Sequence, residues 1–138
     1  VAAVMLNMDF DQIGVKLHGN FGQNTGNYGL GSQTYNIAEW DAVKQEIVNV
    51  MTMGGFGEFS YKLSDKSLIT LGASYTTSDS DLYDDADSAM AAFGQFGYNL
   101  GKGLKISPEV GLLNNMKDKN GNEEGSLMYF GTQLRMDF

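Results

Sequence analysis

The chain has 138 residues, 42% of them hydrophobic, and contains no apolar run near the roughly 20 residues that a transmembrane helix needs. Its formal net charge of −8 argues against nucleic acid as a partner, because phosphates select a basic surface. The absence of cysteine excludes thiol catalysis, disulfide bonds and cysteine-based zinc sites.

Short segments in which apolar and polar residues alternate follow one another along the chain. Because side chains of a strand point alternately to its two faces, this alternation predicts half-buried strands. Residues 2–10 and 13–23, separated only by Asp11 and Gln12, predict a hairpin. Five further strands are predicted, at 47–63, 67–77, 89–100, 104–113 and 127–138. We therefore expect an all-β, antiparallel fold in which residues 1–138 form a single segment.

The connections between these strands alternate between short turns and long polar loops. The turns follow residues 10, 63 and 100, and the loops cover 24–46, 78–88 and 114–125. Residues 37–48 carry apolar side chains three or four positions apart, which predicts a short surface helix rather than a pore-constricting segment. Pro108 lies inside a predicted strand, where we expect a bulge or a local break in pairing because proline has no amide hydrogen.

The last strand carries the most specific pattern. In residues 128–138 one face is apolar and the other polar, and the segment ends in Phe138. This pattern resembles the C-terminal strand of outer-membrane β-barrels of Gram-negative bacteria, where a terminal Phe after alternating apolar residues is read by the barrel-insertion machinery. The resemblance implies an insertion signal made of Phe130, Leu134, Met136 and Phe138. A half-buried strand of a soluble antiparallel sheet is the alternative.

The segregation of short turns from long loops is typical of the same barrels, which have periplasmic turns and extracellular loops. Aromatic residues near the strand ends on the apolar face resemble the two interfacial girdles of such barrels. Bacterial single-chain barrels have an even number of strands, so seven strands indicate part of a larger antiparallel up-and-down transmembrane β-barrel. A 16-stranded porin and an eight-stranded barrel both remain open.

The polar faces would then line the interior of the barrel. A spread of mixed polar side chains suits a water-filled passage better than a single reaction centre. Glu58, Glu109, Lys16 and Arg135 are the candidates for setting ion preference, unless they pair across neighbouring strands and serve only stability. The complete set of pore-lining candidates is Asp9, Lys16, His18, Asn20, Glu58, Lys62, Lys105, Glu109, Gln133 and Arg135.

Neither catalysis nor a metal site is expected. His18 is the only histidine, and in outer-membrane phospholipases the His and Ser face lipid, whereas His18 is predicted to point inward. The carboxylates of 79–87 and of 118–124 have calcium-like spacing, but neither segment completes an EF-hand loop. We expect these loops to be solvated or to bridge lipopolysaccharide, and we assign no metal and no cofactor.

These expectations describe a porin-type channel of the bacterial outer membrane, for passive diffusion of small hydrophilic solutes or ions. The acidic 79–87 loop predicts a mild preference for cations. The expected partners are membrane lipid, lipopolysaccharide, the barrel-insertion machinery and, as in many porins, two further copies in a homotrimer. The alternatives are a small non-conducting structural or adhesive barrel, and a soluble ligand-binding barrel of the avidin or lipocalin type with inverted faces.

Overall fold

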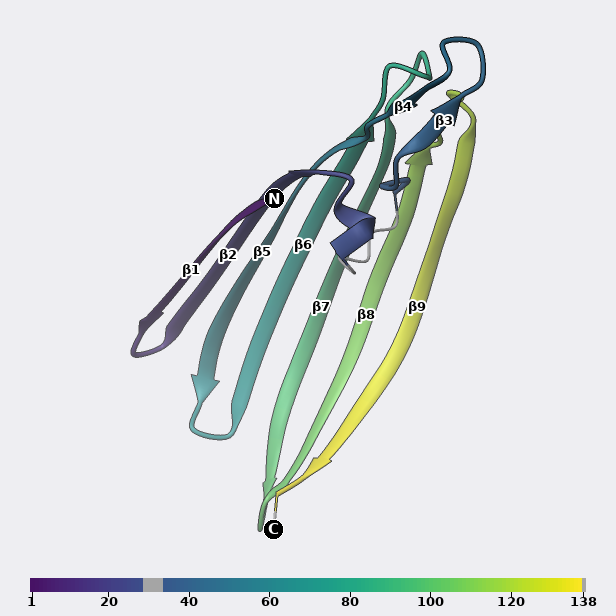
Figure 1. Cartoon of the computed structure of the whole chain (residues 1–138). Helices are drawn as coiled ribbons and strands as arrows, with labels where there is room; N and C mark the ends of the chain where they lie inside the picture. Colours follow the sequence, from purple (N-terminus) through teal and green to yellow (C-terminus); the bar gives the residue numbers. More distant parts are fainter. Residues whose placement is uncertain (29–33, 138) are drawn as a thin grey trace.

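The computed structural model describes residues 1–28 and 34–137 (Figure 1). Seven long antiparallel strands dominate it, and within the described residues no helix is long and apolar enough to cross a membrane. The all-β, antiparallel prediction is confirmed. The strands of the main sheet are β1 (Ala2–Phe10), β2 (Ile13–Gln23), β5 (Met51–Ser64), β6 (Ser67–Asp79), β7 (Asp87–Gly101), β8 (Leu104–Lys117) and β9 (Glu123–Met136).

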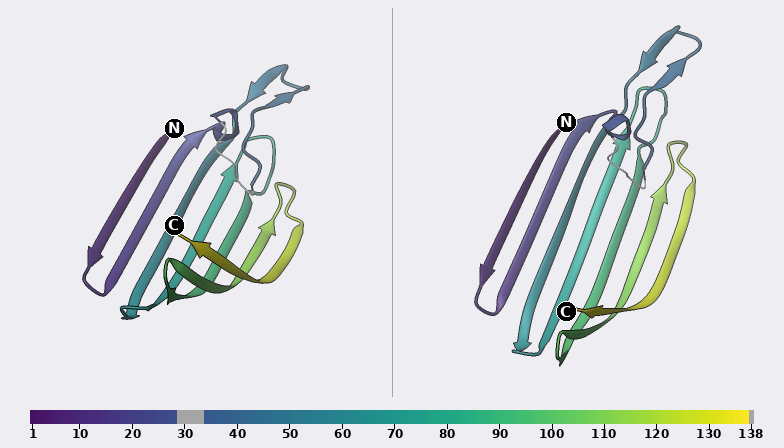
Figure 2. Two further views of the ribbon diagram at one scale, coloured as in Figure 1. Left: turned by 90° about the horizontal axis from the view of Figure 1, so that it is seen from below. Right: turned by 60° about the horizontal axis from the view of Figure 1, so that its bottom comes forward.

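The sheet is a meander in which each strand pairs with the next one along the main sheet. The order is β1-β2-β5-β6-β7-β8-β9, so β1 and β9 are its two edges and the sheet does not close. The sheet curves, and η1 (Thr25–Tyr28) lies over its concave side (Figure 2). Barrel closure and a position in a membrane therefore stay predictions.

The two ends of the sheet differ. One end, the turn end, carries the tight connections at 11–12, 65–66 and 102–103, and the other, the loop end, carries all the long connections (Figure 1). The strands β6 and β7 have 13 and 15 residues, which corresponds to roughly 43–50 Å along the strand. On the loop side β6 to β9 extend beyond the predicted limits, because polar pairs such as Lys117 opposite Glu123 continue the backbone ladder.

The prediction of a short helix at 37–48 is wrong. The chain forms a hairpin of β3 (Glu39–Asp41) and β4 (Glu46–Val48), which is a separate two-stranded sheet. The Asp41 carboxylate accepts the amides of Val43 and Lys44 at 2.8 and 3.1 Å, which favours a turn over a helix. The predicted strand 47–63 accordingly divides into β4 and β5, and the fully buried Val50 lies between them.

Pro108 is accommodated without a bulge. The ladder between β7 and β8 is interrupted after the Gln95–Glu109 pair and resumes at Tyr98–Ile106 in the same register. On its other side Pro108 lies opposite Thr132 of β9. Proline thus causes the local break in pairing and leaves the register of the sheet unchanged.

The apolar side chains of the sheet do not form a core. Leu71 is 53% exposed, Leu134 68% and Phe130 79%, and all lie on the convex face. Among the described residues, the buried apolar side chains are Val48, Val50 and Ala89 alone. The other buried side chains are polar, and those of Thr52, Ser78 and Ser107 are among the least exposed. The burial pattern is therefore the inverse of that in a water-soluble sandwich, where the apolar faces are enclosed.

Two glycines with positive φ flank the turn between β7 and β8, and one of them lies close to the end of β9. Gly101 and Gly103 have φ values of +91° and +76°, which L residues rarely adopt. A Cβ on Gly103 would lie 2.1 Å from the Asp137 carbonyl oxygen, whereas one on Gly101 would meet nothing within 4 Å. The backbone of Asp137 also donates to the Gly103 carbonyl at 2.9 Å. Gly103 thus permits the chain beyond β9 to pack against this turn.

We predict that Gly101→Ala costs about 1 kcal/mol of unfolding free energy, from backbone strain alone. Gly103→Ala should cost about 2 kcal/mol more, because its methyl group also displaces the Asp137 backbone. Urea titration of both variants beside the parent chain measures the difference. Equal losses for the two variants would show that the close approach to Asp137 is unimportant.

Candidate functional site: the polar face and the loop end

The concave face of the sheet is lined by the polar positions of every strand. The cross-strand row through its middle contains Asn7, Lys16, Glu58, Gly72, Phe93, Gly111 and Tyr129. All ten predicted pore-lining residues lie on this face, since each is in the row or an even number of positions away from the row's residue in the same strand. The face is mixed, because aromatic rings alternate with glycines in one half of the row and charged groups occupy the other.

Two candidate charges form a cross-strand pair. Lys16 of β2 lies directly opposite Glu58 of β5, and its Nζ is 2.7 Å from Glu58 Oε1. The Lys16 side chain is 58% exposed and that of Glu58 19%. The pair neutralises both charges locally, so neither is an isolated charge on this face.

Glu109 is held by a hydrogen-bond network instead of a cation. Its Oε1 accepts the Tyr129 hydroxyl at 2.8 Å, and its Oε2 accepts the Gln95 amide at 3.0 Å. A Cβ on Gly111 would lie 2.3 Å from the Tyr129 ring, so the ring packs over this glycine. The absence of a side chain at Gly111 thus lets Tyr129 reach Glu109.

Two basic side chains are neighbours at the turn end of the polar face. Lys105 and Arg135 are direct cross-strand neighbours, an arrangement that is unfavourable for like charges. Arg135 donates from Nε to Asp137 at 2.9 Å, and both side chains are largely exposed. The Lys105 side chain extends over Gly97, whose Cβ would lie 2.9 Å from its Cε. These charges are not brought together with Lys16 or Glu58, which lie several rows away.

The other candidates lie apart from these groups. His18 and Asn20 follow one another on the polar face of β2, and the cross-strand neighbours of His18 are Met5 and Phe56. Asp9 and Lys62 lie near the turn end, and Gln133 is opposite Ser107. The structure therefore shows one direct ion pair among the ten candidates.

The segment between β2 and β5 folds back over the loop end of the polar face. Thr34 Oγ1 lies 2.8 Å from Ser78 Oγ, which in turn lies 3.0 Å from Thr52 Oγ1. The backbone amide of Tyr35 donates to Asp87 at 2.7 Å. Because these partners are buried polar residues of β5, β6 and β7, hydrogen bonds fix the segment to the sheet.

Four side chains join the loops to one another, and sequence analysis did not identify them. Tyr35 and Glu39 come from the β2–β5 segment, Tyr83 from the β6–β7 loop and Lys119 from the β8–β9 loop. The Tyr83 hydroxyl donates to Glu39, which also forms a 3.0 Å ion pair with Lys119. We call these four residues the loop clasp. Hydrogen bonds from Tyr83 and Lys119 outweigh burial and lower the pKa of Glu39.

The acidic loops make no metal site in the described part of the chain, where no group of three or more His, Asp or Glu side chains is placed to hold an ion. Asp118 instead accepts the backbone amides of Asn120 and Asn122 at 2.9 and 2.8 Å. Hydrogen bonds from Asn122 and Asn120 lower the pKa of Asp118. The loop therefore uses its own amides to satisfy the carboxylate.

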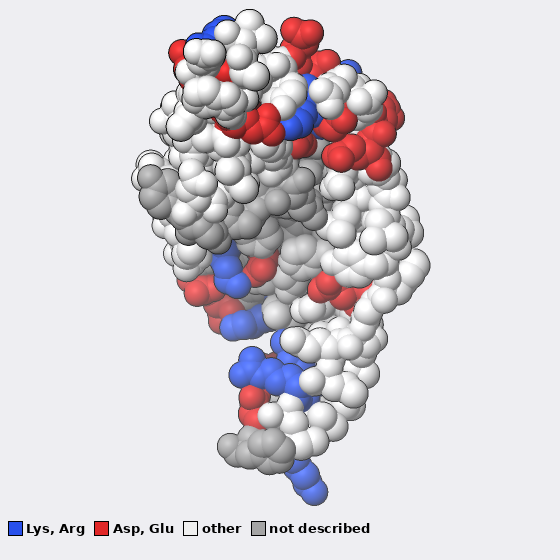
Figure 3. Space-filling view, turned by 45° about the vertical axis from the view of Figure 1, so that its right-hand side comes forward, with Lys and Arg blue, Asp and Glu red and all other residues white. Residues whose placement is uncertain are grey.

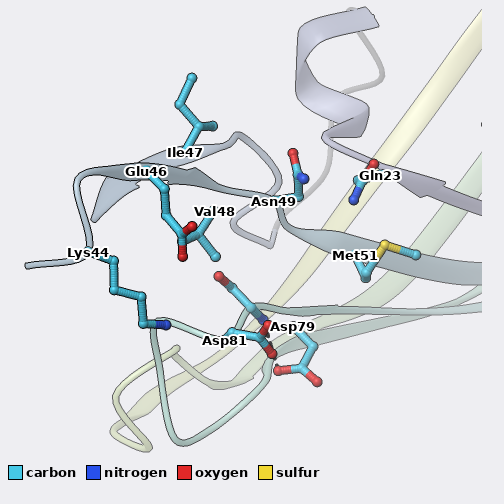
Figure 4. Close-up of a pocket in the computed structure, with 10 residues that line it drawn as sticks. Gln23, Lys44, Glu46, Ile47, Val48, Asn49, Met51, Asp79 and Asp81 are labelled. Atoms are coloured by element: carbon cyan, nitrogen blue, oxygen red, sulfur yellow. Dashed lines mark hydrogen bonds between the residues drawn. The ribbon is translucent and has the colours of Figure 1, made fainter. Parts of the chain in front are cut away.

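A cleft of about 340 Å³ lies beside the β3–β4 hairpin. Lys44 and Glu46 extend from one side of it and Asp79 and Asp81 from the other (Figure 4). More broadly, Asp and Glu crowd the loop end while Lys and Arg gather toward the turn end (Figure 3). The loop end is therefore acidic, whereas both signs of charge occur at the turn end.

The described residues of the predicted insertion signal share the convex face. Phe130, Leu134 and Met136 are 79%, 68% and 56% exposed. Phe138 lies outside the described residues. The described members of the signal therefore form one exposed apolar stripe along the edge strand β9.

No family model, curated protein or solved structure matches the chain.

We predict that Lys16 and Glu58 contribute little to stability as a pair. A double-mutant cycle with Lys16→Met and Glu58→Gln should give a coupling free energy below about 1 kcal/mol, because the lysine is exposed. Urea unfolding of the four proteins provides the cycle. A coupling above about 2 kcal/mol would show that the pair is a principal stabilising contact.

Proposed function

We propose that this chain forms part of a porin-type β-barrel of the bacterial outer membrane. In this proposal the convex face contacts lipid, the concave face lines a water-filled passage, and small hydrophilic solutes or ions diffuse through it. The observation that carries the proposal is the inverted pattern of the sheet, with exposed apolar side chains on one face and polar ones on the other.

The apolar stripes have the length that a bilayer requires. On the convex face of β8 the stripe runs from Leu104 to Leu112, and on β9 from Met128 to Met136. Each stripe covers nine residues, and a strand that is tilted across an apolar band about 25 Å tall needs about 9–11. The next residues on that face, Asn114 and the opposed Ser126, are polar. The polarity thus changes in the same row of neighbouring strands.

Aromatic side chains occupy the ends of the apolar face, as interfacial girdles do. Phe10, Tyr61 and Tyr98 lie near the turn end, and Phe21 and Tyr75 toward the loop end. All five are more than one-third exposed on the open sheet. An exposed girdle supports a lipid environment and gives no support to an avidin- or lipocalin-like barrel, which needs its apolar side chains enclosed.

The free edges of β1 and β9 support a larger barrel, because an unpaired edge cannot remain exposed in hydrocarbon. Further strands of an even-numbered barrel would pair with these edges. The proposed partners are membrane lipid, lipopolysaccharide, the barrel-insertion machinery, and other copies of the chain in a homotrimer.

The proposed cation preference is mild and arises mainly at the loop end. Glu58 is paired with Lys16, whereas the 79–87 loop contains five Asp and no Lys or Arg, so the acidic loops contribute the larger uncompensated field. The ten predicted lining residues keep their proposed role in shaping the passage.

Single-channel recording in planar bilayers tests the proposal. We expect discrete ohmic steps and a reversal potential that shows a modest excess of cation over anion permeability. The triple variant Asp81→Asn, Asp84→Asn and Asp85→Asn should bring the two permeabilities closer together, and raising the salt concentration should have the same effect on the parent chain. Folded protein that leaves the bilayer silent would contradict a channel.

A non-conducting structural or adhesive barrel is the second candidate. The observation that favours it is the anchored β2–β5 segment, which covers the loop end of the polar face. The silent bilayer described above is the result that this candidate predicts.

A further inference from the structure

The loop clasp brings together the three long connections at the loop end. Its members are far apart in sequence, since Glu39 and Tyr83 are separated by 44 residues and Glu39 and Lys119 by 80. Two of these connections also touch directly, because a Cβ on Gly121 would lie 2.4 Å from Asp85 Oδ2. The clasp therefore ties separate hairpins of the meander together outside the backbone ladder.

The geometry of the clasp is that of a site for an ammonium group. The Tyr35 and Tyr83 rings are nearly perpendicular, at 84°, with centroids 6.1 Å apart. Lys119 Nζ lies 4.1 Å from one centroid and 4.3 Å from the other, within the range of a cation–π interaction. The same nitrogen is 3.0 Å from the Glu39 carboxylate and 2.9 Å from the Tyr83 hydroxyl.

Every group around this nitrogen favours a positive charge. Two aromatic faces and a carboxylate are partly shielded from water, with the Lys119 and Glu39 side chains only 28% and 35% exposed. Although burial opposes the charged form, hydrogen bonds to Tyr83 and Glu39 raise the pKa of Lys119. A neutral side chain of the same length would fill the space without satisfying the carboxylate.

We propose that Tyr35, Tyr83 and Glu39 form a binding site for a primary alkylammonium group, that Lys119 occupies it as a tethered ligand, and that this occupancy holds the long loops together over the loop end. When the site is vacated, the loops lose their shared cation and separate. The inference does not depend on channel activity, because every contact that it uses lies in the loops.

The first test compares Lys119→Met with Lys44→Met. Lys44 is a matched control in the same loop region, because its side-chain ammonium forms a long ion pair of 3.8 Å with Asp41 and lies outside the clasp. Hydrogen exchange of the Tyr35 amide, which donates to Asp87, reports loop opening in the folded full-length protein. We expect the Tyr35 amide to exchange about tenfold faster in Lys119→Met and at the parent rate in Lys44→Met. Exchange within β6 to β8 should be unchanged in both variants.

The second test restores the ammonium group from solution. Propylammonium supplies the atoms that Lys119→Ala removes beyond Cβ, so it should slow the exchange of the Tyr35 amide back toward the parent rate. Propanol and sodium chloride at the same concentration control for solvent and ionic strength. An unchanged rate in Lys119→Met, or a rescue by propylammonium no greater than that by propanol or salt, would overturn the proposal. Neither result bears on conductance, so it is distinguishable from failure of the channel proposal.

Discussion

The antiparallel backbone ladder holds this chain together, because the described residues enclose almost no apolar core. Long strands pair the main-chain groups across the sheet from β1 to β9, with register shifts only near the ends of β5 and β7, while large apolar side chains such as Leu71 and Phe130 remain exposed. In water this arrangement would leave the hydrophobic effect unused. In lipid it is the expected one, since a spanning sheet must satisfy its own backbone groups and has no need to bury its apolar face. The proposed membrane insertion and transport depend on this inverted burial.

The two ends of the sheet differ in their connections and in their charges. At the turn end, residues such as Gly103 allow tight connections that leave little chain outside the strands. At the loop end, long connections fold back onto buried polar positions of the sheet and are joined by Lys119 to one another. The charges follow the same division, because acidic groups gather at the loop end and both signs of charge occur at the turn end (Figure 3). A passage along the polar face would therefore have chemically different mouths.

Most of the sheet could be predicted from sequence, and most of the loop end could not. Period-two alternation places Lys16 and Leu17 on opposite faces without knowledge of any partner strand, so β1 and β2 have the limits expected. The apolar spacing at 37–48 fits a helix or a hairpin equally well, and Asp41, by capping a turn, decides for the hairpin. The loop clasp depends on how separate loops meet in space, and the local sequence pattern carries no information about that. Likewise, the Glu109 network requires the packing of Tyr129 over Gly111.

The proposed function requires that the convex face meets lipid, and a nitroxide scan along β6 tests this orientation most directly. The chain contains no cysteine, so single cysteines at residues 69–76 can each be labelled without background. In proteoliposomes of the full-length protein, labels at Ile69, Leu71, Ala73 and Tyr75 should be accessible to lipid-soluble oxygen, and those at the intervening positions to a water-soluble nickel chelate. Accessibility that does not alternate, or that alternates in the opposite phase, would contradict the orientation.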